Sequence, residues 1–269
     1  MSRVVAIVNQ KGGVGKTTTS VNLAAALAIA ERNVLLIDSD PQSNSTRALG
    51  FAEDSERASL YDALAGEASL TDIAVEVAGL PHLALVPGDR ELIGTEVELS
   101  GVEGREFRLK GLLALTRERY QHILIDCPPS LGLLTLNALT AADAVLIPVQ
   151  CEYLALEGIS QLTETLDRVR QALNPALEIE GVVMTMYDDR TNLSKQVVDE
   201  VRSVFGDLVY KTVVPRNIRL GEAPSHGKPI FLYDIRSRGA EAYLNLAKEF
   251  VEHEKKGAGQ GALRAPAGS

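Results

Sequence analysis

Short apolar runs recur along the chain and alternate with segments of helical periodicity. The first run, residues 4–8, is followed by a glycine-rich turn, an alanine-rich segment at 17–30 and a second apolar run at 34–37. Continuous apolar runs of this length are typical of parallel strands that are buried on both faces. Strand, helix and strand in this order predict a parallel sheet with a right-handed crossover.

The same alternation continues toward the C-terminus. We expect further strands at residues 83–86, 123–125, 144–147, 181–185 and 209–214. Helices are expected at residues 105–119, 154–173, 193–205 and 239–253. There is neither an internal repeat nor a proline- and serine-rich linker, so we expect one α/β domain over residues 1–254. Its sheet should be mostly parallel and twisted, with helices on both faces. Residues 255–269 are rich in Gly and Ala without apolar periodicity, so we expect a disordered tail.

Composition and charge narrow the class of protein. The 269 residues are 45% hydrophobic and 23% charged, which is ordinary for a soluble globular protein. No apolar run approaches the roughly 20 residues that span a bilayer, and no secretory signal is visible at the N-terminus. The two cysteines, Cys127 and Cys151, offer no disulfide framework, and a cytoplasmic location is expected. The net charge of −9 argues against global attraction to DNA or an anionic membrane but leaves a local basic patch open.

A phosphate-binding pattern follows the first predicted strand and opens the first predicted helix. Residues 10–17 read Q-K-G-G-V-G-K-T, which matches G-x-x-x-x-G-K-[ST] except that Gln10 stands at the first glycine. Glycines allow several backbone N–H groups to surround phosphate at a helix N-terminus. Lys16 is expected to reach the β- and γ-phosphates and the Thr17 hydroxyl to ligate Mg²⁺, while Thr18 contacts the α-phosphate. The residues expected to bind ATP in this loop are Lys11, Gly12, Gly13, Val14, Gly15, Lys16, Thr17 and Thr18.

Three aspartates lie at the ends of predicted parallel strands, where ligands bind in open α/β sheets. Asp38 and Asp126 directly follow their strands and are expected to hold magnesium or its water shell. Asp40 stands two residues further into the loop and is the candidate for positioning the hydrolytic water. Helix capping by these loop aspartates is the alternative, and Cys127 is expected to be a small residue rather than a nucleophile.

Several motifs together resemble one superfamily of ATPases. The stretch K-G-G-x-G-K-T, with its additional Lys11, resembles the deviant Walker A motif of the ParA/MinD superfamily. The D-x-D-P-Q segment at 38–42, M-Y-D-D-R-T-N at 186–192 and the block at 214–240 resemble ParA/Soj-type partitioning ATPases, and the resemblance covers residues 3–250. It implies an ATPase that forms a homodimer with ATP sandwiched between the subunits, Lys11 reaching the partner's nucleotide to act with Lys16 and Asp40. It also implies that Pro215 and Asn217 lie beside the adenine.

The same resemblance implies a DNA target. Residues 211–240 hold six basic and two acidic side chains, a local charge of +4 in an acidic protein, and such a stripe can bind phosphates nonspecifically. Arg190 and Arg219 correspond to the family's DNA-contacting arginines. A ParB-type centromere-binding partner would accelerate hydrolysis and release the DNA, which implies chromosome or plasmid segregation by a nucleoid-associated protein. The alternative for these arginines is a solvated basic face, or pairing with internal acids.

Other members of the superfamily and other classes fit less well. A MinD-like positioning ATPase, acting on a membrane or a protein cargo, is the main alternative. It needs an amphipathic C-terminal helix, whereas the last predicted helix carries Glu249, Glu252 and Glu254, so no membrane partner is expected. The cysteines do not match an iron–sulfur protein, and no motif indicates the substrate pocket of a metabolic P-loop enzyme.

Overall fold

The computed structural model describes residues 2–52, 54, 57–153 and 155–257, and its seven strands form one sheet in the order β3-β4-β2-β5-β1-β6-β7. Neighbouring strands are parallel except β3 and β4, which confirms the expected mostly parallel α/β fold. The strands are β1 (Arg3–Ile7), β2 (Val34–Asp38), β3 (Val75–Glu76), β4 (Leu83–Val86), β5 (His122–Asp126), β6 (Ala144–Gln150) and β7 (Glu178–Thr185).

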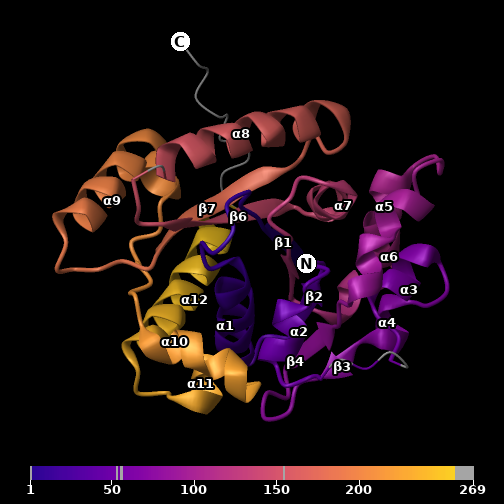
Figure 1. Cartoon of the computed structure of the whole chain (residues 1–269), viewed down its shortest axis with the longest axis horizontal. Coiled ribbons are helices and arrows are strands. Elements are labelled where there is room, and N and C mark those ends of the chain that lie inside the picture. The colour runs from indigo at the N-terminus through magenta and orange to yellow at the C-terminus, as the bar shows by residue number, and fades with distance from the viewer. Residues whose placement is uncertain (1, 53, 55–56, 154, 258–269) are drawn as a thin grey trace.

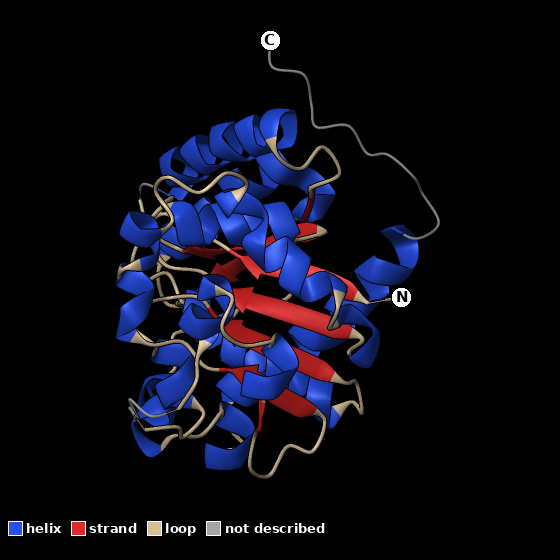
Figure 2. Ribbon diagram, turned by 90° about the vertical axis from the view of Figure 1, so that its right-hand side faces the viewer, coloured by secondary structure: helices blue, strands red, loops and turns tan. Residues whose placement is uncertain are grey.

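Two apolar cores lie on the two faces of this sheet. In β1, Val4 and Ala6 belong to one core and Val5 and Ile7 to the other, as alternation in a strand requires. This two-sided burial is why the strands read as continuous apolar runs. Figure 2 shows the strands enclosed by helices on either side.

The first core is covered by helices from the middle of the chain. They are α3 (Leu60–Ala65), α4 (Leu70–Ile73), α6 (Arg108–Ala114), α7 (Leu133–Ala141), α8 (Ala155–Ala172) and α9 (Asn192–Phe205), with α5 (Thr95–Glu98) packed on α7. The second core is covered by α1 (Lys16–Ile29), α2 (Asn44–Ala48), α10 (Ile218–Glu222), α11 (Ile230–Tyr233) and α12 (Arg238–Gly257). Helix α1 is almost wholly buried, because α12 lies alongside it and α2 and α11 also pack against it (Figure 1).

Two predicted elements differ from the structure. In the strand expected at 209–214, only Val209 forms a bridge with β7. The Tyr210 and Val214 N–H groups donate to carbonyls of β7. The Lys211 and Thr212 N–H groups between them donate instead to the Glu249 carboxylate of α12, at 2.7 and 3.0 Å, which interrupts the pairing. The helix expected at 105–119 is three pieces: the short 3₁₀ turns η2 (Arg105–Phe107) and η3 (Arg117–Arg119) flank α6. The Asn137 side chain accepts from the Leu109 N–H and donates to the Arg105 carbonyl, and it replaces the helical bond between those two residues.

The C-terminal helix is longer than expected. Helix α12 continues to Gly257, whereas the sequence predicts its end near residue 253 and a tail from 255. The rest of that predicted tail, residues 258–269, lies outside the described residues. Within the described part of the chain, no helix is both long and apolar enough to cross a membrane.

Candidate functional site

The glycine-rich loop connects the end of β1 to the start of α1. Gly13 and Gly15 have φ of 75° and 89°, a left-handed conformation that favours glycine, and Gly15 caps the N-terminus of α1. The Val14 carbonyl accepts a 2.7 Å hydrogen bond from the Thr185 hydroxyl at the end of β7. The loop is therefore fixed to the sheet, with Gly12 and Gly13 exposed to solvent and the first turn of α1 directly behind them.

Lys16 lies inside this loop and is only 7% exposed. Its ammonium group donates to the Lys11 carbonyl at 3.2 Å, so the side chain folds back along the loop. Burial lowers the pKa of Lys16, and the charges of Asp126 and Asp40 oppose that shift. The ammonium group thus lies where it can meet phosphate oxygens that the loop backbone would surround.

Asp38 and Asp126 end two neighbouring strands and face each other in register across β2 and β5. Both are fully buried. Burial, followed by the charge of Asp126, raises the pKa of Asp38 to about 7. Burial also raises the pKa of Asp126. Two buried carboxylates side by side lose favourable hydration and repel each other when both are ionised. A cation between them would relieve both penalties.

Hydroxyl groups surround the Asp126 carboxylate. Oδ1 accepts from Ser20 at 2.9 Å and Oδ2 accepts from Ser45 at 2.7 Å, while a hydrogen bond from Thr17 also favours the ionised form. Thr17 of α1 and the two strand-end carboxylates, Asp38 and Asp126, therefore form a set of hard oxygen donors at the carboxyl end of the parallel strands. Such a set suits Mg²⁺. Among the described residues, no three His, Cys, Asp or Glu side chains could hold a metal. This donor set is of the kind in which magnesium relies on phosphate and water for its other ligands.

Asp40 lies in the turn between β2 and α2 and is 5% exposed. Its Oδ1 accepts from the Gln42 N–H at 2.9 Å, and its carbonyl accepts from the Ser43 N–H at 2.8 Å. The charge of Asp40 acts on both Lys16 and Asp126. The structure thus brings Asp40 to the same site as the loop lysine and the strand-end carboxylates.

Lys11 points away from this buried group. Its Nζ lies 3.4 Å from Glu152 Oε2, and each of these side chains is 46% exposed. Arg216 approaches the other Glu152 oxygen at 3.9 Å. Glu152 therefore holds two cations on the rim of the loop.

Pro215 and Asn217 lie on the segment that runs beside the end of β7. Pro215 forms an isolated parallel bridge with Tyr187, two residues beyond Thr185. The Asn217 side-chain oxygen accepts from the Leu220 N–H at 3.3 Å and caps α10. Pro215 therefore lies beside the segment that leaves β7, the strand that supports the glycine-rich loop. Their contact with adenine stays a prediction.

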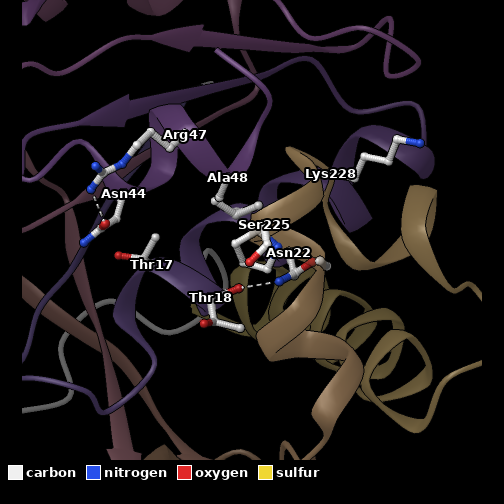
Figure 3. Close-up of a pocket in the computed structure, with 11 residues that line it drawn as sticks. Thr17, Thr18, Asn22, Asn44, Arg47, Ala48, Ser225 and Lys228 are labelled. Carbon is white, nitrogen blue, oxygen red and sulfur yellow. Dashed lines mark hydrogen bonds between the residues drawn. The ribbon is translucent and has the colours of Figure 1, made fainter. Parts of the chain in front are cut away.

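A cavity of about 400 Å³ opens beside the first turn of α1 (Figure 3). It lies between α1, α2 and the segment 223–228, and Thr17 and Thr18 form part of its wall. Asn22, whose amide nitrogen donates to the Thr18 carbonyl at 2.8 Å, lines it one turn further along. The lining residues are Thr17, Thr18, Val21, Asn22, Asn44, Arg47, Ala48, Ala223, Pro224, Ser225 and Lys228.

The two arginines expected to contact DNA each pair with nearby acids. Arg190 is 82% exposed and binds Asp188 through two hydrogen bonds of 2.9 and 2.7 Å, which lower the pKa of Asp188 to about 2. Arg219 lies 2.9 Å from Glu222 and 3.4 Å from Asp234. In this structure both arginines therefore pair with acids, which the sequence analysis gave as an alternative to a free basic surface. Exposed ion pairs contribute only about 0–1 kcal/mol, so phosphate groups can compete with the carboxylates.

Some site residues carry no sequence motif that we could interpret. Ser20, Ser45 and Thr46 donate hydrogen bonds to the two buried carboxylates, and Glu152 binds Lys11. Ser20 could have been found, because it follows Lys16 by one helical turn. The others depend on how distant segments pack.

Comparisons with known proteins find relatives along almost the whole chain. A family model described as "AAA domain" matches residues 2–179. The chain is 54% identical over 255 residues to the chromosome partitioning protein ParA of Caulobacter vibrioides, covering 94% of this chain and 95% of that one. It is 57% identical over 249 residues to the sporulation initiation inhibitor protein Soj of Bacillus subtilis, covering 93% and 98%.

Solved structures share the fold along nearly the whole chain. A structure named cobyrinic acid a,c-diamide synthase, from Mycobacterium smegmatis with bound ADP and magnesium, is 38% identical with a TM-score of 0.83. It covers 96% of this chain and 97% of that one. The cell division ATPase MinD of Pyrococcus furiosus is 27% identical, with a TM-score of 0.77 and coverage of 94% and 99%.

Proposed function

The chain belongs to the ParA/Soj family of chromosome partitioning ATPases, and we propose that it segregates DNA through an ATP-driven cycle of dimerisation and DNA binding. The observation that carries this proposal is the meeting of Lys16, Asp40 and the carboxylate pair Asp38 and Asp126 at one end of the sheet. ATP and Mg²⁺ are the ligands that this set of groups suits.

We assign each site residue a role in this cycle. The loop backbone and Lys16 bind the phosphates, with Thr18 at the α-phosphate, and Pro215 and Asn217 lie beside the adenine. Thr17, Asp38 and Asp126 would hold magnesium, which would supply positive charge to the phosphates. Asp40, anchored by its turn, orients the water that attacks the γ-phosphate.

Lys11 is the residue through which we expect one subunit to act on the other. Its side chain lies on the exposed rim rather than among the groups around Lys16, so it is available to a second subunit. We propose that two subunits close over their nucleotides and that Lys11 of each neutralises charge in the other's site. An arginine finger acts in the same way.

DNA binding then depends on the dimer. Arg190 and Arg219 are exposed, and closure doubles the basic surface that carries them, which favours nonspecific binding of double-stranded DNA at the nucleoid. A ParB-type partner would accelerate hydrolysis and so release the DNA. The similarity to a structure named as a diamide synthase weighs less than the 54–57% identity to partitioning proteins over almost the whole chain.

The test compares nucleotide states of the full chain. With a non-hydrolysed ATP analogue and Mg²⁺, we expect a dimer by size exclusion and a salt-sensitive mobility shift with DNA of any sequence; with ADP we expect neither. Lys11→Ala should bind ATP as a monomer, and Arg219→Glu should dimerise without binding DNA. Binding to anionic liposomes but not to DNA would instead support a MinD-like positioning ATPase.

A further inference from the structure

Thr46 occupies a central place in the hydrogen bonds behind the magnesium-binding carboxylates. It lies in α2, eight residues after Asp38, and is 3% exposed. Its backbone N–H and its hydroxyl both donate to Asp38 Oδ2, at 2.8 and 2.7 Å. The same hydroxyl accepts from the Gly88 N–H at 3.0 Å. This buried hydroxyl therefore donates to Asp38 and accepts from Gly88, and so connects the two groups.

The Asp38 carboxylate joins both ends of the loop that carries Asp40. Oδ2 is held by Thr46 at the far end, and Oδ1 accepts from the Asp40 N–H at 3.3 Å. Ser45, next to Thr46, donates to Asp126 at 2.7 Å. The segment from Asp38 to Thr46 is thus closed on itself through one carboxylate and tied by its end to the second.

Gly88, after β4, packs against the closed segment from Asp38 to Thr46. A β-carbon at residue 88 would lie 2.5 Å from the Asp38 carbonyl oxygen, so the backbone after β4 packs directly against the end of β2. Since Gly88 also donates to the Thr46 hydroxyl, three segments meet at this side chain. Thr46 can hardly move without displacing either Asp38 or the segment after β4.

We propose that Thr46 is a positioning residue for ATP hydrolysis, which fixes the Asp38 carboxylate and thereby the loop that presents Asp40 to the attacking water. Its hydroxyl acts through Asp38, to which it donates. The inference rests on the proposed role of Asp40 and adds the group that sets its position. Because small misplacements of a catalytic group lower the rate strongly, loss of the Thr46 hydroxyl should reduce turnover more than ATP binding.

Thr46→Val removes the hydroxyl at nearly constant volume, and Thr46→Ser keeps it. A hydrogen bond to a charged group is strong enough to change a rate by about tenfold or more. We expect kcat to fall at least about tenfold in Thr46→Val and to stay within about twofold of the original in Thr46→Ser. Affinity for a fluorescent ATP analogue with Mg²⁺ should change by less than about threefold in both.

Thr140→Val is the matched control, since Thr140 is equally buried in α7 and its hydroxyl has no hydrogen-bond partner in the described part of the chain. It should keep full turnover. Should Thr46→Val fail to fold, Thr46→Cys, which retains a weak S–H donor, should give an intermediate kcat. Equal rates for the original chain, Thr46→Val and Thr46→Cys would overturn the inference, and so would equal losses in Thr46→Val and Thr46→Ser. An ATP affinity that falls as much as kcat would also overturn it. A wild-type chain that neither binds nor hydrolyses ATP would instead refute the proposed function.

Discussion

The paired carboxylates predict an unusual dependence of stability on pH. An aspartate ordinarily has a pKa of 3.8, and burial together with the neighbouring Asp126 raises the pKa of Asp38 to about 7 in the folded chain. A carboxyl group with a raised folded pKa stabilises the fold most below its unfolded pKa, and this contribution is lost as the pH rises through the folded value. Stability of the nucleotide-free protein should therefore fall between about pH 4 and pH 7.

The size of the effect follows from the shift. About three pKa units correspond to about 4 kcal/mol between the two limits, of which about 2–3 kcal/mol falls between pH 5 and pH 8. Asp38→Asn removes this titration and also the repulsion between the two carboxylates. We expect the variant to gain stability relative to wild type by about that amount as the pH rises from 5 to 8.

Urea unfolding of both proteins in EDTA, at intervals between pH 5 and 8, measures the difference directly. Asp188→Asn is the control: Arg190 lowers the pKa of Asp188 to about 2, so its titration ends below this range and its curve should run parallel to wild type. Parallel curves for wild type and Asp38→Asn would refute the reasoning, because they would mean that Asp38 titrates alike in the folded and unfolded chains.

Three further changes test other parts of the site. Asp40→Ala should bind the ATP analogue and dimerise normally while phosphate release falls below about 1% of wild type; unchanged release would remove Asp40 from the mechanism. Glu152→Gln should strengthen the ATP-dependent dimer by up to about fivefold, because it frees Lys11 from an exposed ion pair of about 0–1 kcal/mol. Sedimentation measures the dimer, and a weaker dimer would show that Glu152 instead binds the partner. Tyr243→Phe, which removes the 3.2 Å bond to the Thr19 hydroxyl in α1, should lower the unfolding free energy by about 1 kcal/mol in urea titrations, and no change would show that this bond contributes nothing.

The sequence predicts most of the sheet because its strands are buried on both faces. Such strands need apolar side chains at every position, and all but the short antiparallel strand β3 can be found from that signal alone. The segment 209–214 has the same apolar character but is no strand. The N–H groups of Lys211 and Thr212 in its middle bond to Glu249, 37 or more residues away, and no local pattern indicates such a contact. The broken helix at 105–119 has a similar cause, since Asn137 comes from another helix.

In the site, too, some residues can be found from local sequence patterns and others only from the structure. Glycines, Lys16 and the aspartates at strand ends are found from the sequence, because phosphate binding and parallel strands impose local spacing. The strand register that sets Asp38 opposite Asp126 follows from the fold. The hydroxyl donors Ser45 and Thr46 and the cis partner of Lys11, Glu152, depend on side-chain packing between segments, so their roles appear only in three dimensions.

The donors to the two buried carboxylates connect two central strands to a short helix. Asp38 and Asp126 belong to central strands that are rigidly held on both sides, whereas their donors Ser45 and Thr46 belong to a helix of five residues. The Asp40 segment lies between these strands and the short helix, so its position depends on the bonds that Ser45 and Thr46 make to the two carboxylates. The Gly88 N–H holds the Thr46 hydroxyl from a third segment. On the roles proposed above, the carboxylates that would hold magnesium are therefore also the groups that fix the far end of the loop carrying Asp40.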